Sequence, residues 1–391
     1  MTYFIGLDIA KHKHDCFIMN ENGEVIRDSF SFANDVIGFN TLLDALKTLD
    51  PAQEKRIGLE ATGHYGSNLK NFLERKDYSF MEINPILISR FSKATTLRRT
   101  KTDKIDARLI ALYLCTVDYK PYPVKSYHIR NLRSLCRARD SLVKERSLQL
   151  VKLTNVLDLI FPEFKPFFNG SLRSATALYL LENYGTPSKM ARMNIDSYRK
   201  MKSALRNTIS YARFVELKEL AKNTVGNEDE ILVFELELYL ELFKELNARV
   251  DSVESRILEE YENVNCHIDT IPGIGPVTAA CIYSEIGNIS RFSNADQLLA
   301  FAGLDPSRNQ SGEADYNGHM VKHGSSYLRE YLMNAAEMQL VHNPPMYEYY
   351  RKKRNEGKAH RVALSHVAKR LVRIIFALEK NDTDFDEKKM R

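Results

Sequence analysis

The sequence predicts an α/β amino-terminal domain, a helical middle region and a mainly α-helical carboxy-terminal domain. Short apolar strand patterns alternate with helical patterns over the first part of the chain. Two long amphipathic patterns then indicate long helices, and a Pro- and Gly-containing segment introduces the last helices. A length of 391 residues suits two or three domains at about 100–200 residues each.

The amino-terminal elements open with an antiparallel meander. The predicted order is strands at 3–9, about 14–20 and about 24–32, a helix at about 36–49, a strand at 56–60, a helix at about 66–76 and a strand at about 79–84. Asn22-Gly23, between the second and third strands, favours a type I′ hairpin turn, because both central residues of that turn need positive φ. The order β-β-β-α-β-α-β is that of ribonuclease-H-like domains. A helix from Asp103 to about Val117 completes a domain that we place at 1–122.

The rest of the chain is predicted to be mainly helical. Helices at 127–160 and about 228–265 flank an insert, 171–226, whose pattern says little, and they suggest a coiled-coil-like oligomerisation region at 123–266. The carboxy-terminal domain, 267–380, starts with IPGIGPVTAA, continues through a Gly- and Asn-rich segment at 303–326 and ends in helices. The tail, 381–391, is expected to fray.

Composition indicates a globular protein of a reducing compartment. Hydrophobic residues make up 44% and charged residues 27% of the chain. Apolar runs are too short to span a membrane, and the amino-terminus does not resemble a secretory signal. The five cysteines are scattered without a CxxC pair, so neither a zinc site nor a disulfide framework is suggested. We therefore expect a cytoplasmic protein that does not enter membranes.

Four acidic residues stand where a divalent metal site could form. Asp8 is near the end of the first strand and Glu60 closes the fourth, and these strands are neighbours in a ribonuclease-H-like sheet. Asp103 and Asp106 share one helix face at a spacing of three residues. Such carboxylates repel one another unless divalent cations neutralise them, and two-ion sites catalyse phosphodiester displacement. The alternative for each residue alone is a strand-end turn or a helix cap.

Basic residues gather in two segments although the net charge is only +5. Residues 90–108 hold seven basic residues against two acidic ones, and 351–361 hold six against one. Such clusters are typical of nucleic-acid binders, although many are solvated helix faces. Within the first segment we predict phosphate contacts for four residues, namely Arg98, Arg99, Lys101 and Lys104.

The carboxy-terminal half offers further candidate contacts. Gly273 and Gly275 resemble a helix-hairpin-helix loop, in which backbone N–H groups approach a phosphate; the alternative is a plain turn into a core helix. Lys322 and Arg329 are candidate phosphate or RNA contacts, or else helix-face charges.

These motifs resemble the IS110 family of transposases. The matching segments are GLDIAK (6–11), GLEATGHYG (58–66), INP (83–85), RRTKTDKIDARLIA (98–111), IPGIGPVTAA (271–280), LLAFAGLDPSRNQSGEA (298–314) and VKHGSSYLREYLMNAA (321–336). They cover both ends of the chain, whereas the middle matches only in helical character. One departure is Lys322-His323-Gly324-Ser325, where the family usually has a lysine-glycine-asparagine segment.

The resemblance implies a RuvC-like, Mg²⁺-dependent domain whose Asp-Glu-Asp-Asp set is Asp8, Glu60, Asp103 and Asp106. Mn²⁺ is expected to substitute for Mg²⁺. The resemblance also implies that Ser311 attacks DNA and forms a phosphoserine link. The implied partners are double-stranded DNA at the element ends and target, and a structured guide RNA. A dimer or tetramer of the chain is expected.

The residues themselves leave alternatives to Ser311 open. Ser311 falls in a polar segment, Ser307 to Gly318, that we expect to be an exposed loop. The competing nucleophiles are Ser307, Ser325, Ser326 and Tyr316. A serine hydroxyl needs a nearby base or charge stabilisation to attack. If Ser311 takes no part, the alternative is a Mg²⁺-dependent junction-resolving nuclease that uses metal-activated water. A non-catalytic binding module is disfavoured because all four carboxylates are present.

Overall fold

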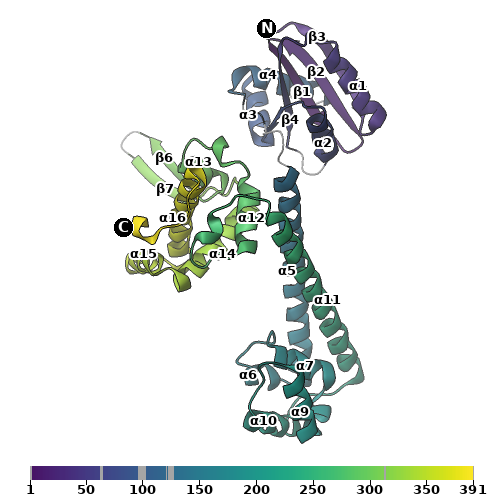
Figure 1. Cartoon of the computed structure of the whole chain (residues 1–391), viewed down its shortest axis with the longest axis vertical. Helices are drawn as coiled ribbons and strands as arrows, with labels where there is room; N and C mark the ends of the chain where they lie inside the picture. Colours follow the sequence, from purple (N-terminus) through teal and green to yellow (C-terminus); the bar gives the residue numbers. More distant parts are fainter. Residues whose placement is uncertain are drawn as a thin grey trace. The chain divides into compact units, whose positions relative to one another are not determined.

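The computed structural model describes residues 2–61, 65–95, 103–119, 121, 127–311 and 314–390 (Figure 1). The chain divides into two compact units, Met1–Tyr127 and His128–Arg391. No helix within the described residues is long and apolar enough to cross a membrane.

The described part of the first unit is built on one mixed sheet in the order β3-β2-β1-β4-β5. Its strands are β1 (Thr2–Ile9), β2 (Lys13–Asn20), β3 (Val25–Ala33), β4 (Glu54–Glu60) and β5 (Phe80–Ile83). The first three strands form an antiparallel meander, whereas β4 runs parallel to β1 and β5 runs parallel to β4. The predicted pairing of the first and fourth strands is therefore confirmed.

The turn between β2 and β3 is a hairpin, but its predicted type was wrong. Gly23 has a φ of 81°, whereas Asn22 does not adopt positive φ. The Gly23 N–H donates to the Asn20 carbonyl at 3.1 Å, and the Asn20 side chain accepts from the backbone N–H groups of Asn22 and Glu24. One left-handed glycine after an ordinary turn suffices here because Asn20 itself holds the loop closed.

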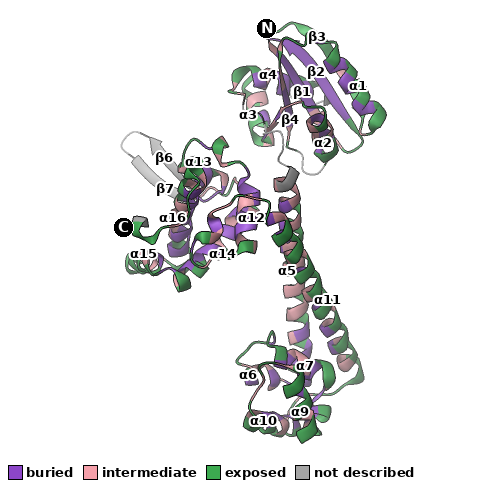
Figure 2. Cartoon of the chain, in the orientation of Figure 1, coloured by how far each residue is buried: buried purple, intermediate pink, exposed green. Residues whose placement is uncertain are grey.

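Helices cover both faces of this sheet (Figures 1 and 2). One face packs against α1 (Val36–Lys47) and α2 (Ser67–Arg75). The other packs against α3 (Pro85–Thr95) and α4 (Asp103–Thr116). We did not predict α3 from the sequence; Pro85, expected to end a strand, is instead the first residue of this helix, a position that proline tolerates.

The second unit contains a helical hairpin made of its two longest described helices, α5 (Tyr127–Ile160) and α11 (Glu230–Tyr261). Arg139 Nε donates to Glu254 at 2.6 Å and Arg146 to Asn247 at 3.1 Å. Residue numbers rise on one helix as they fall on the other, so the pair is antiparallel. The predicted coiled-coil-like pairing thus occurs within one chain.

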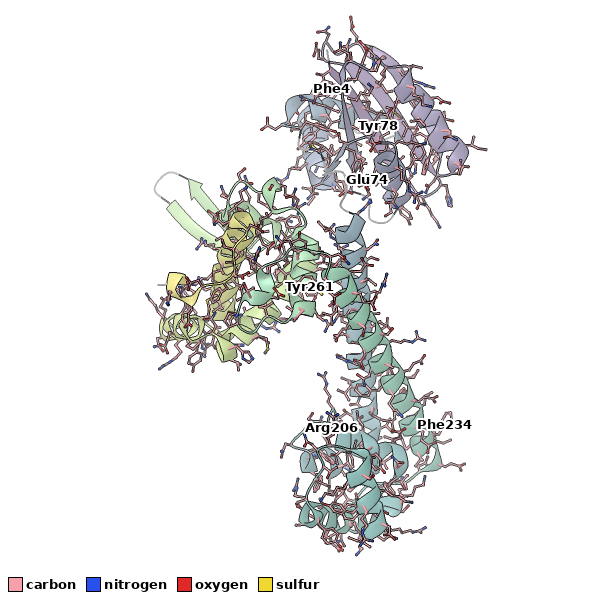
Figure 3. The ribbon with its side chains drawn as sticks, viewed as in Figure 1. Phe4, Glu74, Tyr78, Arg206, Phe234 and Tyr261 are labelled. Carbon is pink, nitrogen blue, oxygen red and sulfur yellow. The ribbon has the colours of Figure 1, made fainter. Side chains whose placement is uncertain are left out.

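Short helices form the insert at the far end of this hairpin. They are α6 (Phe164–Phe167), α7 (Ala175–Asn183), α8 (Pro187–Ala191), α9 (Ile195–Ala204) and α10 (Tyr211–Lys222). Their apolar residues share one core with the ends of α5 and α11, through Leu153, Leu157 and Leu236. Apolar side chains also remain outside this core: Ile231, Phe234 and Leu238 are exposed along α11, and Figure 3 shows Phe234 projecting from the helix.

The opposite ends of α5 and α11 belong to the carboxy-terminal core. Leu132 and Tyr261 pack with the helices α12 (Pro276–Ile286), α13 (Ala295–Phe301), α14 (Ser326–His342), α15 (Pro344–Asn355) and α16 (His360–Asn381). Short 3-10 turns occur at Ile268–Thr270, Ile289–Arg291 and Glu387–Met390. The roots of the long helices and the predicted 267–380 region therefore share one compact unit.

The tail differs from the expected frayed end. His267 lies 2.9 Å from an Asp382 oxygen and 2.7 Å from an Asp384 oxygen. The Phe385 N–H donates to the Thr270 hydroxyl at 2.9 Å. These contacts hold the first residues of the tail against the 3-10 turn that precedes α12.

The Gly- and Asn-rich segment also differs from the expected loop. It forms an antiparallel pair, β6 (Pro306–Ser311) and β7 (Ala314–Met320). The Val321 N–H donates to the Asp305 carbonyl at 2.9 Å and closes the base of this β6–β7 hairpin. Polar strands pair in this way because the backbone supplies the hydrogen bonds, and residue polarity alone does not reveal them.

Candidate active site

Backbone register places Asp8 and Glu60 at the same edge of the sheet. Leu7 pairs with Leu59 in the parallel β1–β4 ladder, and Asp8 and Glu60 are the next residues. Neighbouring residues in register point to the same face of a sheet. Gly6 and Gly58 stand two residues earlier on that face. Both carboxylates are half-buried.

Helix α4 lies directly on this face because two glycines allow it to. A Cβ added to Gly6 would lie 2.0 Å from the Ala107 carbonyl oxygen, and one added to Gly58 would lie 2.8 Å from Leu114. After the helix, the Tyr119 hydroxyl donates to the Ser79 carbonyl just before β5 and accepts from the Ile57 N–H. The helix therefore ends toward the start of the strands and begins at the edge where β1 and β4 end.

The first turn of α4 brings Asp103 and Asp106 to that carboxylate edge. Asp106 immediately precedes Ala107, which contacts Gly6, and it is half-buried. Asp103 is the first residue of α4, one turn earlier, and its side chain lies outside the described atoms. The fold thus gathers the backbone positions that the sequence selected.

A further carboxylate, which our sequence reasoning missed, stands on the same face. Asp15 of β2 pairs directly with Asp8 of β1. Asp15 is 2% exposed and accepts a 2.5 Å hydrogen bond from the Ser31 hydroxyl, while Lys13 Nζ is 3.9 Å away. Only the register of the strand pair shows that Asp15 lies beside Asp8, because opposed residues of an antiparallel pair share a face.

The donor set at the carboxylate edge is chemically suited to a hard divalent cation, since carboxylate oxygens are what Mg²⁺ prefers. The described side chains do not include three His, Cys, Asp or Glu residues grouped around one ion position, but the Asp103 carboxylate is not among them. By ligand type the residues present fit a divalent ion, and the backbone places them at one edge of the sheet.

The predicted basic contacts of the first unit lie largely outside the described atoms. Arg98, Arg99 and Lys101 fall outside the described residues, and Lys104 is placed on α4 without its side chain. Their role in binding phosphate stays a prediction.

Ser311 is the last residue of β6 and pairs with Ala314 of β7. It therefore lies at the tip of the β6–β7 hairpin, whereas we expected an irregular loop. The side chains of Ser311, of its competitor Ser307 and of Tyr316 are not among the described atoms, and Gly312 lies outside the described residues.

Ser325, another competitor, has a structural role. Its hydroxyl accepts from the Leu328 N–H at 3.1 Å as the cap of α14 and donates to Glu285 at 3.1 Å. Glu285 is 2% exposed and is held by Arg137 through contacts of 2.7 and 3.0 Å. A hydroxyl engaged in this way is poorly placed to attack a ligand. Ser326 follows it as the first residue of α14.

Gly273 and Gly275, the two glycines of the PGIG segment, have different surroundings. Gly273 has a φ of 82°, and a Cβ there would lie 3.0 Å from His342 and 3.1 Å from the Met338 carbonyl on α14. Its closest contact is thus another helix of the core, as the plain-turn alternative requires. Gly275 precedes α12 and has open space around its Cβ position. Only Gly275 has room for a ligand beside its backbone.

Arg329 binds backbone within its own unit. Its Nη1 donates to the carbonyls of Ala302 and Lys322, each at 3.4 Å. Lys322 itself is exposed and has a φ of 51°, at a point where the chain packs closely on the preceding turn: a Cβ on Gly324 would lie 2.0 Å from the Phe301 carbonyl oxygen. The described contacts therefore make Arg329 a brace for this loop.

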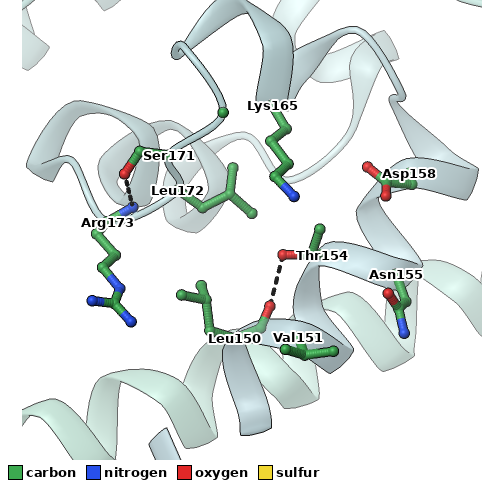
Figure 4. Close-up of a pocket in the computed structure, with 10 residues that line it drawn as sticks. Leu150, Val151, Thr154, Asn155, Asp158, Lys165, Ser171, Leu172 and Arg173 are labelled. Atoms are coloured by element: carbon green, nitrogen blue, oxygen red, sulfur yellow. Dashed lines mark hydrogen bonds between the residues drawn. The ribbon is translucent and has the colours of Figure 1, made fainter. Parts of the chain in front are cut away.

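A hollow of about 550 Å³ lies apart from all these residues. It opens between α5 and the insert and is lined by Thr154, Asp158, Lys165 and Arg173 among others (Figure 4). None of the predicted site residues lines it, so it gives no support to the predicted chemistry.

Comparison with known proteins matches both ends of the chain to transposases. Residues 5–162 match a family model described as a transposase, the DEDD domain of the IS110 type. Residues 266–351 match a model described as the transposase IS116/IS110/IS902 family.

Relatives align along nearly the whole chain. The insertion element IS116 44.8 kDa protein of Streptomyces clavuligerus is 25% identical over 96% of this chain and 94% of its own length. The pilin gene-inverting protein of Moraxella bovis is 23% identical over 98% of each chain. The transposase for insertion sequence element IS1111A of Coxiella burnetii is 26% identical over 86% of this chain and 78% of its own length.

Proposed function

Since this chain belongs to the IS110 family of transposases, enzymes that cut and join DNA, we propose that it is the site-specific recombinase of a mobile insertion element. It would use a carboxylate metal site in the first unit and a serine nucleophile in the second. The observation that carries the proposal is the convergence of Asp8, Glu60 and the first turn of α4 on one edge of the sheet.

The carboxylate edge would hold the divalent ions. Asp8, Glu60, Asp103 and Asp106 would be the ligands, with Mg²⁺ as the usual ion and Mn²⁺ as its substitute. Bound there, such ions would neutralise the acids and stabilise charge on phosphate oxygens. The RuvC-like assignment of this domain is part of the same proposal. Arg98, Arg99, Lys101 and Lys104, close in sequence to Asp103, would hold the nucleic-acid backbone.

Ser311 would form the covalent intermediate. Its oxygen would attack a backbone phosphorus, a bond from serine to phosphorus would form, and the displaced sugar oxygen would leave as a hydroxyl after taking a proton. Attack by a sugar hydroxyl of the new partner strand would reverse these changes and release the serine. The phosphodiester energy is conserved between the two steps, which hydrolysis by water would not achieve.

The partners follow from the family resemblance and the fold. Double-stranded DNA and a structured guide RNA would bind the chain, which would act in the cytoplasm as a dimer or tetramer. Exposed Ile231, Phe234 and Leu238 follow one helical stripe of α11 and favour packing against another copy. Gly275 and Lys322 would contribute phosphate contacts in the second unit.

Denaturing electrophoresis of the full chain with labelled target DNA and the RNA encoded beside its gene tests the serine step. Wild-type protein should give a slow-migrating protein–DNA adduct, and Ser311→Ala should give none while DNA affinity and thermal unfolding stay near the wild-type values. Ser307→Ala, on the same strand, is the matched control and should keep the adduct.

The same gel separates the two mechanistic classes. Cleavage by Ser311→Ala that yields free ends and no adduct would support the alternative, a junction-resolving nuclease that uses metal-activated water. If Ser307→Ala loses the adduct and Ser311→Ala keeps it, the assignment of Ser311 as the nucleophile is refuted.

A further inference from the structure

One surface of the second unit carries a strong excess of positive charge. Residues 344–373, which span α15, the following turn and most of α16, contain nine Lys and Arg residues but only two acids, Glu348 and Glu356. Most of this segment, residues 352–373, lies beyond residues 266–351, which match the family model. Its charge is therefore a feature that the comparisons leave unassigned.

Ring contacts place cations of α15 and α16 side by side: Lys353 Nζ lies 5.6 Å and the Arg370 guanidinium 5.2 Å from the Tyr349 ring. Burial lowers the pKa of His366, and the cations Lys369, Lys353 and Lys358 lower it further, opposed by Glu356. These three lysines come from α16, α15 and the turn between them. Cations from three segments thus lie close enough to His366 to repel its proton.

The positive face continues along α16 in helical spacing. Lys369 and Arg373 follow His366 by three and seven residues and so lie on the same side of the helix. Arg370 stands beside them, with its guanidinium 5.2 Å above the Tyr349 ring. We call this set the cationic face; it comprises Lys353, Lys358, His366, Lys369, Arg370 and Arg373.

Internal acids neutralise the cationic face only in part. Glu356 serves both Lys353, at 2.9 Å, and Lys358, at 3.7 Å. Arg373 lies 3.6 Å from exposed Asp296. Burial lowers the pKa of Lys369, the Asp305 charge opposes that change and the Arg373 charge adds to it. Like charges held together in this way are relieved by an external polyanion.

The cationic face leads to the root of the β6–β7 hairpin. Arg373 lies 3.6 Å from Asp296 of α13, the helix that leads into β6, and the Asp305 charge that acts on Lys369 immediately precedes β6. The Asp305 carbonyl closes the hairpin base with Val321. Ser311 is at the other end of the six-residue strand β6. At about 3.3 Å per residue, the root and the serine are about 20 Å apart, or about six base steps of duplex DNA at 3.4 Å each.

We propose that the cationic face binds the phosphate backbone of duplex DNA flanking the bond that is cut. This inference rests on the proposed function, because it takes Ser311 as the position of the cut. The nearness of the face to the root of the serine-bearing hairpin favours DNA over the guide RNA. The lysines and arginines would bind phosphate without reading sequence.

The salt dependence of duplex binding by the full chain tests the proposal. We compare wild type with a face variant, Lys358→Gln/Lys369→Gln/Arg373→Gln. A control variant, Lys200→Gln/Lys202→Gln/Arg206→Gln, removes the same charge from exposed residues of the insert, where Figure 3 marks Arg206. Three lost phosphate contacts should reduce the slope of log K against log[salt] by about 2.7 in the face variant, at about 0.9 per contact. The control should keep the wild-type slope.

One further variant and one further ligand, the structured RNA, complete the test. The charge-preserving change Lys358→Arg/Lys369→Arg/Arg373→Lys should restore the slope, and thermal unfolding checks that each variant is folded. An unchanged slope in the folded face variant, or an equal loss in the control, would overturn the proposal. So would a loss confined to the structured RNA when duplex binding is intact. Binding needs no cleavage, so absence of a Ser311 adduct refutes the proposed chemistry and leaves this test standing.

Discussion

The carboxylate edge of the first unit and the cationic face of the second both concentrate charge of one sign, but they are built differently. Asp8, Asp15 and Glu60 are placed by strand register, so each acid has one fixed position. Lys358, Lys369 and Arg373 project from a turn and a helix, on long side chains. Asp15 is buried and Asp8 and Glu60 are half-buried; Lys358 and Lys369 are also half-buried, whereas Arg373 is exposed.

The contrast indicates what each region can bind. Fixed, partly buried acids suit a small ion that must be held at one point, where the loss of one ligand is severe. Cations on long side chains suit a repeating chain of phosphates, where contacts are many and each contributes little. Removing one charge should therefore have very different effects in the two regions.

The largest expected effect comes from the acids. Asp8→Ala, Glu60→Ala or Asp106→Ala should each reduce recombination about a thousandfold or more, since a lost metal ligand removes several kcal/mol of transition-state stabilisation. Lys369→Gln should retain most of the activity. A recombination assay with thermal unfolding as the check on folding measures both. Wild-type recombination by two of the acid variants, or full activity in excess chelator, would break the comparison.

Close packing of α4 on the sheet should make the edge sensitive to a single methyl group. Gly6→Ala would press a Cβ into the Ala107 carbonyl, 2.0 Å away, and should lower the free energy of unfolding by at least about 1–3 kcal/mol. Gly275→Ala, with open space at its Cβ, is the control and should change it by a few tenths of a kcal/mol. Denaturant unfolding measures both, and equal values would mean that α4 does not fix the acids.

A variant of Asp15 should show whether a charge beside the four proposed ligands also contributes to metal binding at the carboxylate edge. Asp15→Asn keeps an acceptor for Ser31 but removes a charge opposite Asp8, so Mg²⁺ affinity should fall about tenfold, as is usual for partners just outside the ligands. Calorimetric Mg²⁺ titration measures this. Ser31→Ala keeps the charge and should leave the affinity unchanged; a similar loss there would make the role of Asp15 purely structural.

The smallest expected effect is a change of pKa at two histidines. His14 lies near the carboxylate edge and His366 lies in the cationic face, so each responds to the electrostatic field of its own region. Burial lowers the pKa of His14, and the Asp15 charge opposes that change. At His366 burial and nearby lysines act in the same direction. Asp15→Asn should therefore lower the pKa of His14, whereas Lys369→Gln should raise that of His366. Imidazole NMR titration measures both directions.

The same histidines give a pH dependence of stability. Both have folded-state pKa values below the ordinary 6.5, so the unfolded chain takes up protons first as the pH falls. Their effect on stability is absent well above pH 6.5, and the free energy of unfolding should decrease progressively below it. His14→Phe should reduce that acid sensitivity, and an unchanged pH profile would show that His14 does not contribute to it.

The sequence predicted regular elements well where side-chain pattern and backbone geometry agree. Strand alternation and the Gly6 and Gly58 positions lie within a buried sheet, so Asp8 and Glu60 could be assigned to one edge before the structure was known. Asp15 could not be predicted as part of the carboxylate edge, because its place there depends on pairing with Asp8 on another strand. The β6–β7 hairpin was not predicted, because its strands are polar and are stabilised by backbone pairing.

Roles that depend on packing were also beyond reach of the sequence. Gly273 reads as a phosphate loop, yet its nearest neighbours are Met338 and His342 on α14. Arg329 reads as a ligand contact, yet it donates to internal carbonyls. The local sequence does not predict these contacts, since the contacting residues lie on other segments of the chain.

The insert at the end of the α5–α11 hairpin is joined to the rest of the chain at a single point. The chain leaves α5 at Ile160 and returns at Gly226, where a Cβ would lie 1.9 Å from the Ile160 carbonyl oxygen; Asn227 donates to the Leu159 carbonyl. The entry to the insert and the exit from it therefore touch, at the end of α5, whose 34 residues span about 50 Å. Because its entry and exit meet and its core is separate, a module attached in this way can be shortened or replaced while the folding of the carboxy-terminal core is preserved.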